Sequence, residues 1–279
     1  MSKIRVGRIA FINVAPIYYA LENGRLNHPF ELVADIPAHL NDLMRDGLLE
    51  ISACSCLEYA RRFRQYYLAK DLCIASNGPV MSVLLLAKRP LSELNGAEIL
   101  LSGQSHTSVL LTRLLLEERY HVQATYTNGS VSQALTDGHE PLACLTIGDE
   151  ALKLRNHPSY PYVFDLALEW REWTNLPFVF AVWVISRKAC ALGLIQEDPG
   201  LYLRQSLDYG LAHLDEVIAS VAKKTPLSPA ELDIYYQEAL NFRLTHDQLQ
   251  GLELFYQKIT QHGWLQELPE IHFFDPKMK

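Results

Sequence analysis

Residues 98–120, EILLSGQSHTSVLLTRLLLEERY, decide how the rest of the chain is interpreted. The stretch begins as a short apolar strand over residues 98–101 and passes through a tight polar loop. It then continues as a helix whose apolar residues recur at helical spacing, namely Val109, Leu110, Leu111, Leu114 and Leu115. A strand that leads through a short loop into a helix is the repeating unit of α/β proteins.

Hydroxyl side chains crowd the start of this helix: Ser102, Ser105, Thr107 and Ser108. The first turn of a helix has free backbone N–H groups, and its dipole also favours negative charge, so such a junction suits an anion. Ser and Thr are equally preferred there as N-caps, and the residues leave both interpretations open. The crowding of hydroxyls favours a carboxylate or phosphate site.

Length and composition indicate a globular protein with a sizeable core. The 279 residues suffice for one large or two ordinary domains, and 49% of them are hydrophobic and 20% charged. The net charge of −7, without any block of like charges, argues against nucleic acid as a partner. An anionic ligand would therefore be held by local donors and not by a general positive field.

Metal and cofactor motifs are missing from the sequence. The five cysteines have no zinc-site spacing and are expected to be reduced, buried thiols. The ten histidines form no HxH or HExxH pair, and no GxGxxG, P-loop or GxSxG motif occurs. We expect neither a metal site nor a bound cofactor.

The N-terminal segment superficially resembles a signal peptide, because basic residues precede an apolar run. Asn13 and Pro16 interrupt that run, no small-residue cleavage site follows, and no later segment approaches transmembrane length. The sequence therefore predicts a cytoplasmic protein that does not enter the membrane.

The first part of the chain alternates strands with helices. Strands are predicted over residues 3–12, 30–36 and 50–54, with helices beginning near Ile17, Pro37 and Cys56. This alternation predicts a mainly parallel sheet, whose ligands bind beyond the carboxyl ends of the strands. Asn13 and Ser55 follow two of these strands.

The middle of the chain restarts the same pattern. A strand over residues 142–147 leads into Gly148 and Asp149, and long apolar strands at 80–87 and 178–186 flank the whole segment. After residue 199 only helices are predicted. We therefore expect an α/β fold of two lobes, with lobe 2 (residues 88–182) inserted into lobe 1 (residues 1–87 and 183–279), a helical C-terminal tail, and a hinged cleft where small ligands bind.

The polar residues at these junctions offer mostly amides, hydroxyls and helix N-termini, which suits a small, multiply charged anion. Ser82 lies on the first flanking strand, where a side chain can point between lobes. Asp149 is either a general base or the N-cap of the next helix, and the cap is favoured. The aromatic cluster near residues 170–183 is expected to be mainly core, although one member could cover a ring-shaped ligand.

Six motifs, in order, resemble the chorismate dehydratase family of the futalosine route to menaquinone: RIAFINVAPIYYAL, ISACSCLEYAR, NGPVMSVLL, QSHTSVLLTRLL, LTIGDEAL and DLALEWREWTNLPFVFAVWV. The resemblance runs from about residue 5 to 186. It implies a fold like type II periplasmic binding proteins. It also implies conversion of chorismate, a small dianion, to 3-[(1-carboxyvinyl)oxy]benzoate with loss of water.

The resemblance also implies roles for individual residues. Asn13 and Ser82 are expected at the reacting centre, where they orient the substrate and handle the departing hydroxyl. The residues expected to bind the substrate are Ser55, Ser105, Thr107, Ser108, Gly148, Asp149 and Phe178. Neither Asn nor an unassisted Ser is basic at neutral pH, and one hypothesis is that the substrate's own enolpyruvyl carboxylate accepts the proton.

Two rival interpretations stand beside the dehydratase. The sister enzyme 1,4-dihydroxy-6-naphthoate synthase shares the fold, but that family carries a His-Glu pair where this chain has Gly148 and Asp149. A non-catalytic binding module is the second rival, because fold does not settle function. One departure from the family pattern is Asn175 in place of the usual Gly, and Asn tolerates the left-handed turn required there.

Overall fold

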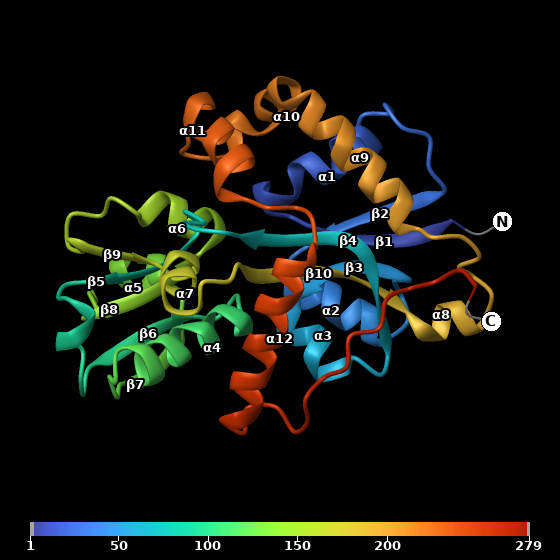
Figure 1. The fold of residues 1–279 in the computed structure, drawn as a ribbon. Coiled ribbons are helices and arrows are strands. Elements are labelled where there is room, and N and C mark those ends of the chain that lie inside the picture. Colours follow the sequence, from blue (N-terminus) through green and yellow to red (C-terminus); the bar gives the residue numbers. More distant parts are fainter. Residues whose placement is uncertain (1–2, 278–279) are drawn as a thin grey trace. The chain divides into compact units, whose positions relative to one another are not determined.

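The computed structural model describes residues 3–277, which divide into two compact units (Figure 1). The first unit contains the described residues up to Ala75, Val179–Lys224 and the chain from Asn241 on, and the second contains Ser76–Phe178 and Thr225–Leu240. These bounds differ from the expected lobes at 1–87, 88–182 and 183–279. The difference has two causes: residues 76–87 belong to the second unit, and so do residues 225–240 of the C-terminal helices.

The first unit is built on a five-stranded sheet of order β2-β1-β3-β10-β4. The strands are β1 (Ile4–Ile9), β2 (Phe30–Asp35), β3 (Ile51–Ser55), β4 (Tyr66–Ser76) and β10 (Phe178–Ser186). β1 pairs in parallel with both β2 and β3, and β10 pairs antiparallel with β3. The parallel sheet expected from the alternating N-terminal pattern is thus present, with an antiparallel strand added from far along the chain.

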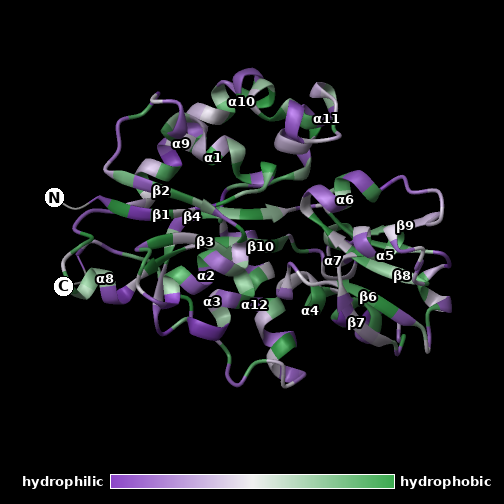
Figure 2. Cartoon of the chain, turned by 180° about the vertical axis from the view of Figure 1, so that it is seen from behind, coloured by the Kyte–Doolittle hydropathy of each residue, from purple (hydrophilic) through white to green (hydrophobic). Residues whose placement is uncertain are grey.

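Helices cover both faces of this sheet, with α1, α9 and α10 on one side and α2, α3 and α12 on the other (Figure 1). The α-helices are α1 (Ala15–Glu22), α2 (Pro37–Arg45), α3 (Cys56–Arg62), α8 (Arg187–Ala191), α9 (Gly200–Ala212), α10 (Leu214–Val221) and α12 (His246–Gln261), and the 3-10 turns are η1 (Ile12–Val14) and η4 (Ala222–Lys224). Hydrophobic residues, drawn in green, occur along the strands and on parts of the helices (Figure 2). Val6, Trp183 and Leu207 are fully buried in the core of this unit.

A buried polar chain fixes α1 against the sheet. Trp183 Nε1 donates to the Tyr18 hydroxyl at 3.0 Å, and that hydroxyl donates to the Gly7 carbonyl at 3.0 Å. On the outer side of α1, helix α9 approaches so closely that a Cβ on Gly210 would lie 2.1 Å from the Pro16 carbonyl oxygen. Only glycine fits this crossing, so α1 is held on both sides.

The second unit has its own five-stranded sheet, of order β7-β6-β8-β5-β9. Its strands are β5 (Val83–Ala87), β6 (Glu98–Ser102), β7 (Thr125–Gly129), β8 (Ala143–Ile147) and β9 (Tyr162–Asp165). β6 is parallel to β7 and β8, whereas β5 is antiparallel to β8 and β9. Because β5 has partners on both sides within this sheet, residues 76–87 belong to the second unit, and the expectation that residues 80–87 form a connection between the lobes is wrong.

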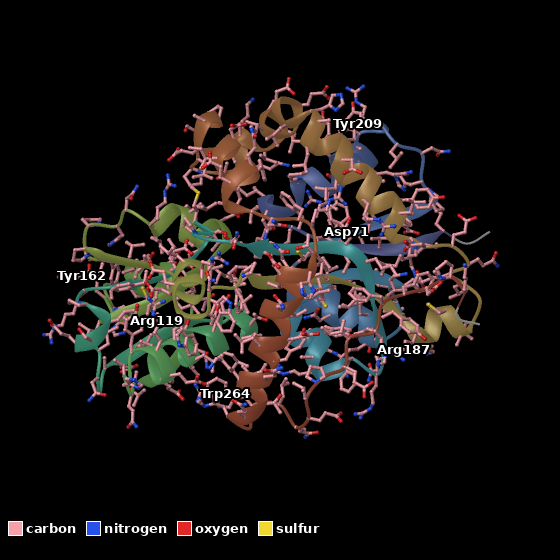
Figure 3. The ribbon with its side chains drawn as sticks, viewed as in Figure 1. Asp71, Arg119, Tyr162, Arg187, Tyr209 and Trp264 are labelled. Carbon is pink, nitrogen blue, oxygen red and sulfur yellow. The ribbon has the colours of Figure 1, made fainter. Side chains whose placement is uncertain are left out.

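The helices of the second unit are α4 (His106–Leu114), α5 (Val131–Thr136), α6 (Gly148–Leu154), α7 (Leu166–Thr174) and α11 (Pro229–Ile234), with a 3-10 turn η2 (Leu91–Glu93) and π-helical turns η3 (Leu115–Arg119) and η5 (Tyr235–Ala239). Arg119 (Figure 3) joins η3 to α7 by donating to the Glu169 carbonyl and to the Glu172 carboxylate. Asn175 ends α7 in the left-handed conformation with φ of 59°, which confirms that Asn supports this turn.

The C-terminal helices do not all belong to one unit, contrary to the expectation that residues 183–279 lie in lobe 1. Residues 225–240, which hold α11 and η5, belong to the second unit. The Arg155 guanidinium at the end of α6 forms an ion pair with Glu231 of α11, which ties this late segment to the rest of the unit. No helix between residues 3 and 277 is long and apolar enough to span a bilayer.

Candidate functional site

The predicted site residues lie at the sheet edges where parallel strands end. Asn13 and Ser55 belong to the first unit, and Ser82, Ser105, Thr107, Ser108, Gly148, Asp149 and Phe178 belong to the second. In the first sheet Val6 lies opposite Ile51 and Gly7 opposite Ser52, so β1 and β3 run side by side in the same direction. Asn13 and Ser55 therefore follow the same edge of that sheet.

Asn13 lies in η1, between the end of β1 and the start of α1. Its Oδ1 atom is buried and has no hydrogen-bond partner among residues 3–277. An unsatisfied buried acceptor costs about 1–3 kcal/mol, so its presence calls for a reason. A ligand hydroxyl or a bound water would satisfy it.

Ser55 is the N-cap of α3, and its hydroxyl oxygen accepts from the Glu58 amide at 3.2 Å. The hydroxyl proton is not used by that bond, because a serine has one donor and two acceptor positions. Ser55 can therefore cap the helix and still donate to a ligand.

The second unit gathers its candidates at one edge of its own sheet. Ser102 is the last residue of β6 and Ser105 follows it, while Gly148 and Asp149 follow the carboxyl end of β8. β5 runs in the opposite direction, with Val83 opposite Ile147, so Ser82 lies at the same edge. The topology thus brings the three predicted clusters of this unit to a common edge.

Two of the hydroxyl residues at the start of α4, Ser105 and Ser108, are hydrogen-bonded to each other. Ser105 Oγ accepts from the Ser108 amide at 3.2 Å and donates to Ser108 Oγ at 3.0 Å. Thr107 and Ser108 are buried. The N-cap interpretation is therefore correct for Ser105, and the anion site at this helix start stays a prediction.

Gly148 and Asp149 are the first two residues of α6. Gly148 has a positive φ of 57°, and its amide donates to the Ser82 carbonyl at 2.7 Å. The expectation that Asp149 caps the helix is wrong, because Ile147 occupies the N-cap position and no side chain caps it. Asp149 Oδ1 is buried without a partner in the described part of the chain, and burial raises the pKa of this carboxyl group.

Ser82 is held more tightly than the sequence indicated. Its side chain is buried, and its Oγ accepts a 3.0 Å hydrogen bond from the hydroxyl of Tyr235. Just before it, Met81 has a left-handed φ of 65°, and the Met81 amide donates to Asp165 Oδ2 at 2.7 Å. Sequence reasoning missed Tyr235, which no local pattern marks, and Asp165, whose place before the apolar helix of α7 is an N-cap signal that could have been used.

Phe178 is fully buried in the second unit. Its ring makes an edge-on contact with Trp170 at 5.4 Å, and the Trp170 indole donates to the Pro177 carbonyl at 3.2 Å. These contacts give Phe178 a packing role. Its expected contact with substrate stays a prediction.

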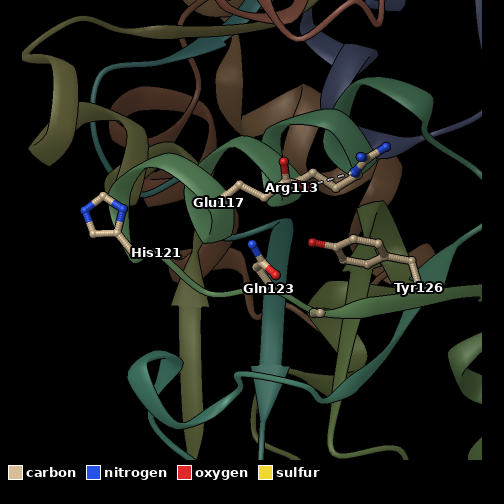
Figure 4. Close-up of a pocket in the computed structure, with 6 residues that line it drawn as sticks. Arg113, Glu117, His121, Gln123 and Tyr126 are labelled. Carbon is tan, nitrogen blue, oxygen red and sulfur yellow. Dashed lines mark hydrogen bonds and ion pairs between the residues drawn. The ribbon is translucent and has the colours of Figure 1, made fainter.

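A surface pocket of about 540 Å³ lies elsewhere in the second unit, among Arg113, Glu117, His121, Gln123, Ala124 and Tyr126 (Figure 4). Arg113 already pairs with Glu117 at 3.3 Å, and its guanidinium lies over the Tyr126 ring at 5.5 Å. Residues 123–126 include the start of β7, whereas the candidate residues follow strand ends. This pocket is therefore distinct from the candidate site.

The donors at the two sheet edges are hydroxyls, amides and backbone N–H groups. Among the described residues no group of three or more His, Cys, Asp or Glu side chains could hold a metal ion. Such neutral donors can bind a carboxylate and stabilise charge that develops on it.

The fold places the chain in the class of type II periplasmic-binding-protein-like proteins. A protein of known structure from Archaeoglobus fulgidus is 20% identical with a TM-score of 0.74, over 95% of this chain and 99% of that one. The periplasmic aliphatic sulphonate binding protein SsuA from Escherichia coli is 11% identical with a TM-score of 0.67, over 100% of this chain and 94% of that one. At such identities the likeness concerns the fold alone.

Sequence comparison then identifies the family. The family model described as menaquinone biosynthesis matches residues 4–261, and the chain belongs to that family. A chorismate dehydratase from Thermus thermophilus is 31% identical over 90% of this chain and 93% of its own length. A 1,4-dihydroxy-6-naphthoate synthase from the same organism is 28% identical over 78% of each chain.

Proposed function

We propose that this protein dehydrates chorismate to 3-[(1-carboxyvinyl)oxy]benzoate as a step of menaquinone biosynthesis. The observation that carries the proposal is the 31% identity with a chorismate dehydratase along nearly the whole of both chains. The site inventory is compatible with it, since a dianionic substrate needs donors and an acidic protein must supply them locally.

The reaction needs little from the protein beyond hydrogen bonding. The ring carboxylate of chorismate is conjugated to C3, so removal of the C3 proton gives a carbanion that is delocalised into this carboxylate. Cleavage of the C4–O bond then expels the hydroxyl group and leaves an aromatic ring. The C3 proton and the hydroxyl together account for the water that is lost.

Hydrogen-bond donors directed at the ring carboxylate stabilise the charge that develops during deprotonation. We assign this work to the N-terminus of α4, with Ser105, Thr107 and Ser108. Asn13 and Ser82 are assigned to the reacting centre, where they orient the substrate and assist the departing hydroxyl. The enolpyruvyl carboxylate of the substrate is proposed as the proton acceptor, because Asn and Ser are not bases at neutral pH.

The rival within the family is 1,4-dihydroxy-6-naphthoate synthase activity. The resemblance assigns that enzyme a histidine base at the position where this chain has Gly148. The positive φ of Gly148 disfavours any side chain there, and the Gly148 amide is already used to hold Ser82. The local structure therefore supports dehydration over the rival reaction.

The test is to incubate the purified protein with chorismate and to follow the benzoate-type ultraviolet absorption of the product. Product identity is checked by mass, and the slow spontaneous decay of chorismate is measured without protein and subtracted. Protein-dependent formation of the benzoate supports the proposal. Binding of chorismate without any product would support a binding module and overturn the enzymatic assignment.

A further inference from the structure

We propose that Tyr235 is a positioning residue that holds the Ser82 hydroxyl as a hydrogen-bond donor toward the substrate. The inference rests on the proposed dehydration and extends it to a residue outside the six motifs that carry the family resemblance. Tyr235 acts through Ser82 and has no assigned contact with the substrate.

The geometry determines which role is left for Ser82. Tyr235 OH donates to Ser82 Oγ at 3.0 Å, and both side chains are buried. This bond occupies an acceptor position of Ser82 and leaves its O–H as the group that can act on a ligand. The O–H has one protein partner within residues 3–277, the Val80 carbonyl at 3.4 Å, which is long for a hydroxyl donor. A substrate oxygen can replace that weak partner at little cost.

Tyr235 is suited to be the donor in this pair. Burial raises the pKa of its hydroxyl, and the negative charges of Asp149 and Asp165 raise the pKa further. The phenol therefore keeps its proton throughout the neutral range. The phenol proton is thus available for the hydrogen bond to Ser82 Oγ.

The backbone of Ser82 is fixed from two other directions. The Gly148 amide donates to the Ser82 carbonyl at 2.7 Å, and Asp165 holds the preceding Met81 amide at 2.7 Å. The hydrogen bond from Tyr235 adds the side-chain restraint that these backbone contacts cannot supply. A group fixed before the substrate arrives needs no reorganisation during the reaction, which is how preorganised donors lower a barrier.

The segment that carries Tyr235 is itself anchored. Ser228 and Glu231 form a capping box at the start of α11, and Arg155 pairs with Glu231 from the end of α6. Tyr235 then begins the π-helical turn η5, a wider turn that is frequent at functional sites. Within the second unit, Ser82 is thus contacted by Tyr235, a residue that lies far from it in the sequence.

The test compares Tyr235→Phe with Tyr160→Phe. Tyr160 is a buried tyrosine of the same unit whose hydroxyl donates to the Pro141 carbonyl at 3.2 Å, before β8 begins and away from Ser82. Tyr235→Phe is expected to lower kcat about tenfold with KM nearly unchanged, the size expected for one hydrogen bond. Both variants are expected to lower the unfolding midpoint to a similar extent. Tyr160→Phe is expected to leave kcat unchanged.

A double-mutant cycle with Ser82→Ala decides whether Tyr235 acts through Ser82. In single turnovers with excess protein, Tyr235→Phe should have no further effect once Ser82 is alanine. An equal loss in both backgrounds, or wild-type kcat in Tyr235→Phe, overturns the inference while the dehydration stands. If the wild-type protein forms no benzoate from chorismate, the proposed function fails first and the inference fails with it.

Discussion

The carboxylate of Asp165 holds two elements of the second unit at once. Its Oδ2 accepts from the Met81 amide at 2.7 Å, while its Oδ1 accepts from the Ala167 and Leu168 amides at the start of α7. Met81 is in a left-handed conformation that costs a non-glycine residue roughly 1–2 kcal/mol. Asp165 therefore stabilises the strained turn from which Ser82 extends.

Replacing Asp165 by Ala should reduce stability and activity together. Loss of the N-cap alone costs about 1 kcal/mol, and the Met81 turn loses its only side-chain acceptor among the described residues. Thermal unfolding and kcat for chorismate measure the two effects. Ser186→Ala removes the N-cap of α8 in the first unit and is the matched control, with a similar loss of stability and normal kcat. Normal turnover in Asp165→Ala would contradict the role of this turn.

Asn13→Ala and Ser82→Ala should each lower kcat by about 10²- to 10³-fold, the range seen when one hydrogen bond to a developing charge is removed. The fold should survive, because Asn13 Oδ1 has no protein partner within residues 3–277 and Ser82 loses only a hydroxyl. Ser220→Ala removes an exposed serine that donates only locally, to Val217, and should leave kcat unchanged. Near-normal turnover in either site variant would refute that residue's assignment.

Asp149→Asn should make the protein more stable at neutral pH. Burial raises the pKa of Asp149 above its unfolded value of about 3.9, so ionisation is less favourable in the folded state. The folded state therefore loses stability as the pH rises from the unfolded pKa through the folded pKa. The asparagine variant lacks that loss. Its unfolding midpoint should exceed that of the wild type at pH 7 and converge with it near pH 3. A lower midpoint at pH 7 would mean that the charged carboxylate stabilises the fold.

Glu231→Gln should show the opposite dependence on pH. Hydrogen bonds from Ser228 and the ion pair with Arg155 lower the pKa of Glu231 to about 2. The stabilisation is therefore present above the unfolded pKa of about 4.3 and is lost as pH falls toward 2. The variant should unfold at a lower temperature than the wild type at pH 7 and at the same temperature near pH 2. A constant difference at every pH would show that the effect does not come from the charge.

Gly210→Ala should destabilise the first unit by about 1–3 kcal/mol, because the new Cβ would meet the Pro16 carbonyl at 2.1 Å and backbone cannot easily yield. Pro16 lies in the helix that follows Asn13, so kcat should fall as well. Gly78→Ala is the matched control, since a Cβ there has no neighbour within 4 Å. Denaturant unfolding and the chorismate assay distinguish the two variants.

Much of the fold could be predicted from local patterns. Hydrophobic spacing predicted a strand over residues 98–101, where β6 is found, and the helix that begins at His106, and β10 lies at the residues expected for it. The family resemblance implied the type II periplasmic-binding-protein-like fold, which the solved structures confirm. Local patterns could not predict that β5 belongs to the sheet of the second unit. An apolar strand can pair with many neighbours, and its sequence does not specify which.

The positions of the candidate residues in the fold could be predicted in part, while their roles in a site stay predictions. Positions such as Asn13 and Gly148 follow strand ends, and a strand end can be recognised from the sequence. The hydrogen bond between Tyr235 and Ser82 joins residues 153 positions apart, and a single tyrosine in a helical stretch leaves no local signal. The N-cap expected of Asp149 was wrong because the helix begins at Gly148, two residues before the start that this cap requires, and Ile147 occupies the N-cap position.

The division of the second unit between two distant stretches of chain has a consequence for synthesis. All five strands of its sheet leave the ribosome before residue 166, whereas Tyr235 emerges much later. A nascent protein can thus pair its strands early while the Ser82 hydroxyl still lacks its tyrosine partner. The hydrogen bond that we propose to orient Ser82 can therefore form only when translation is nearly finished.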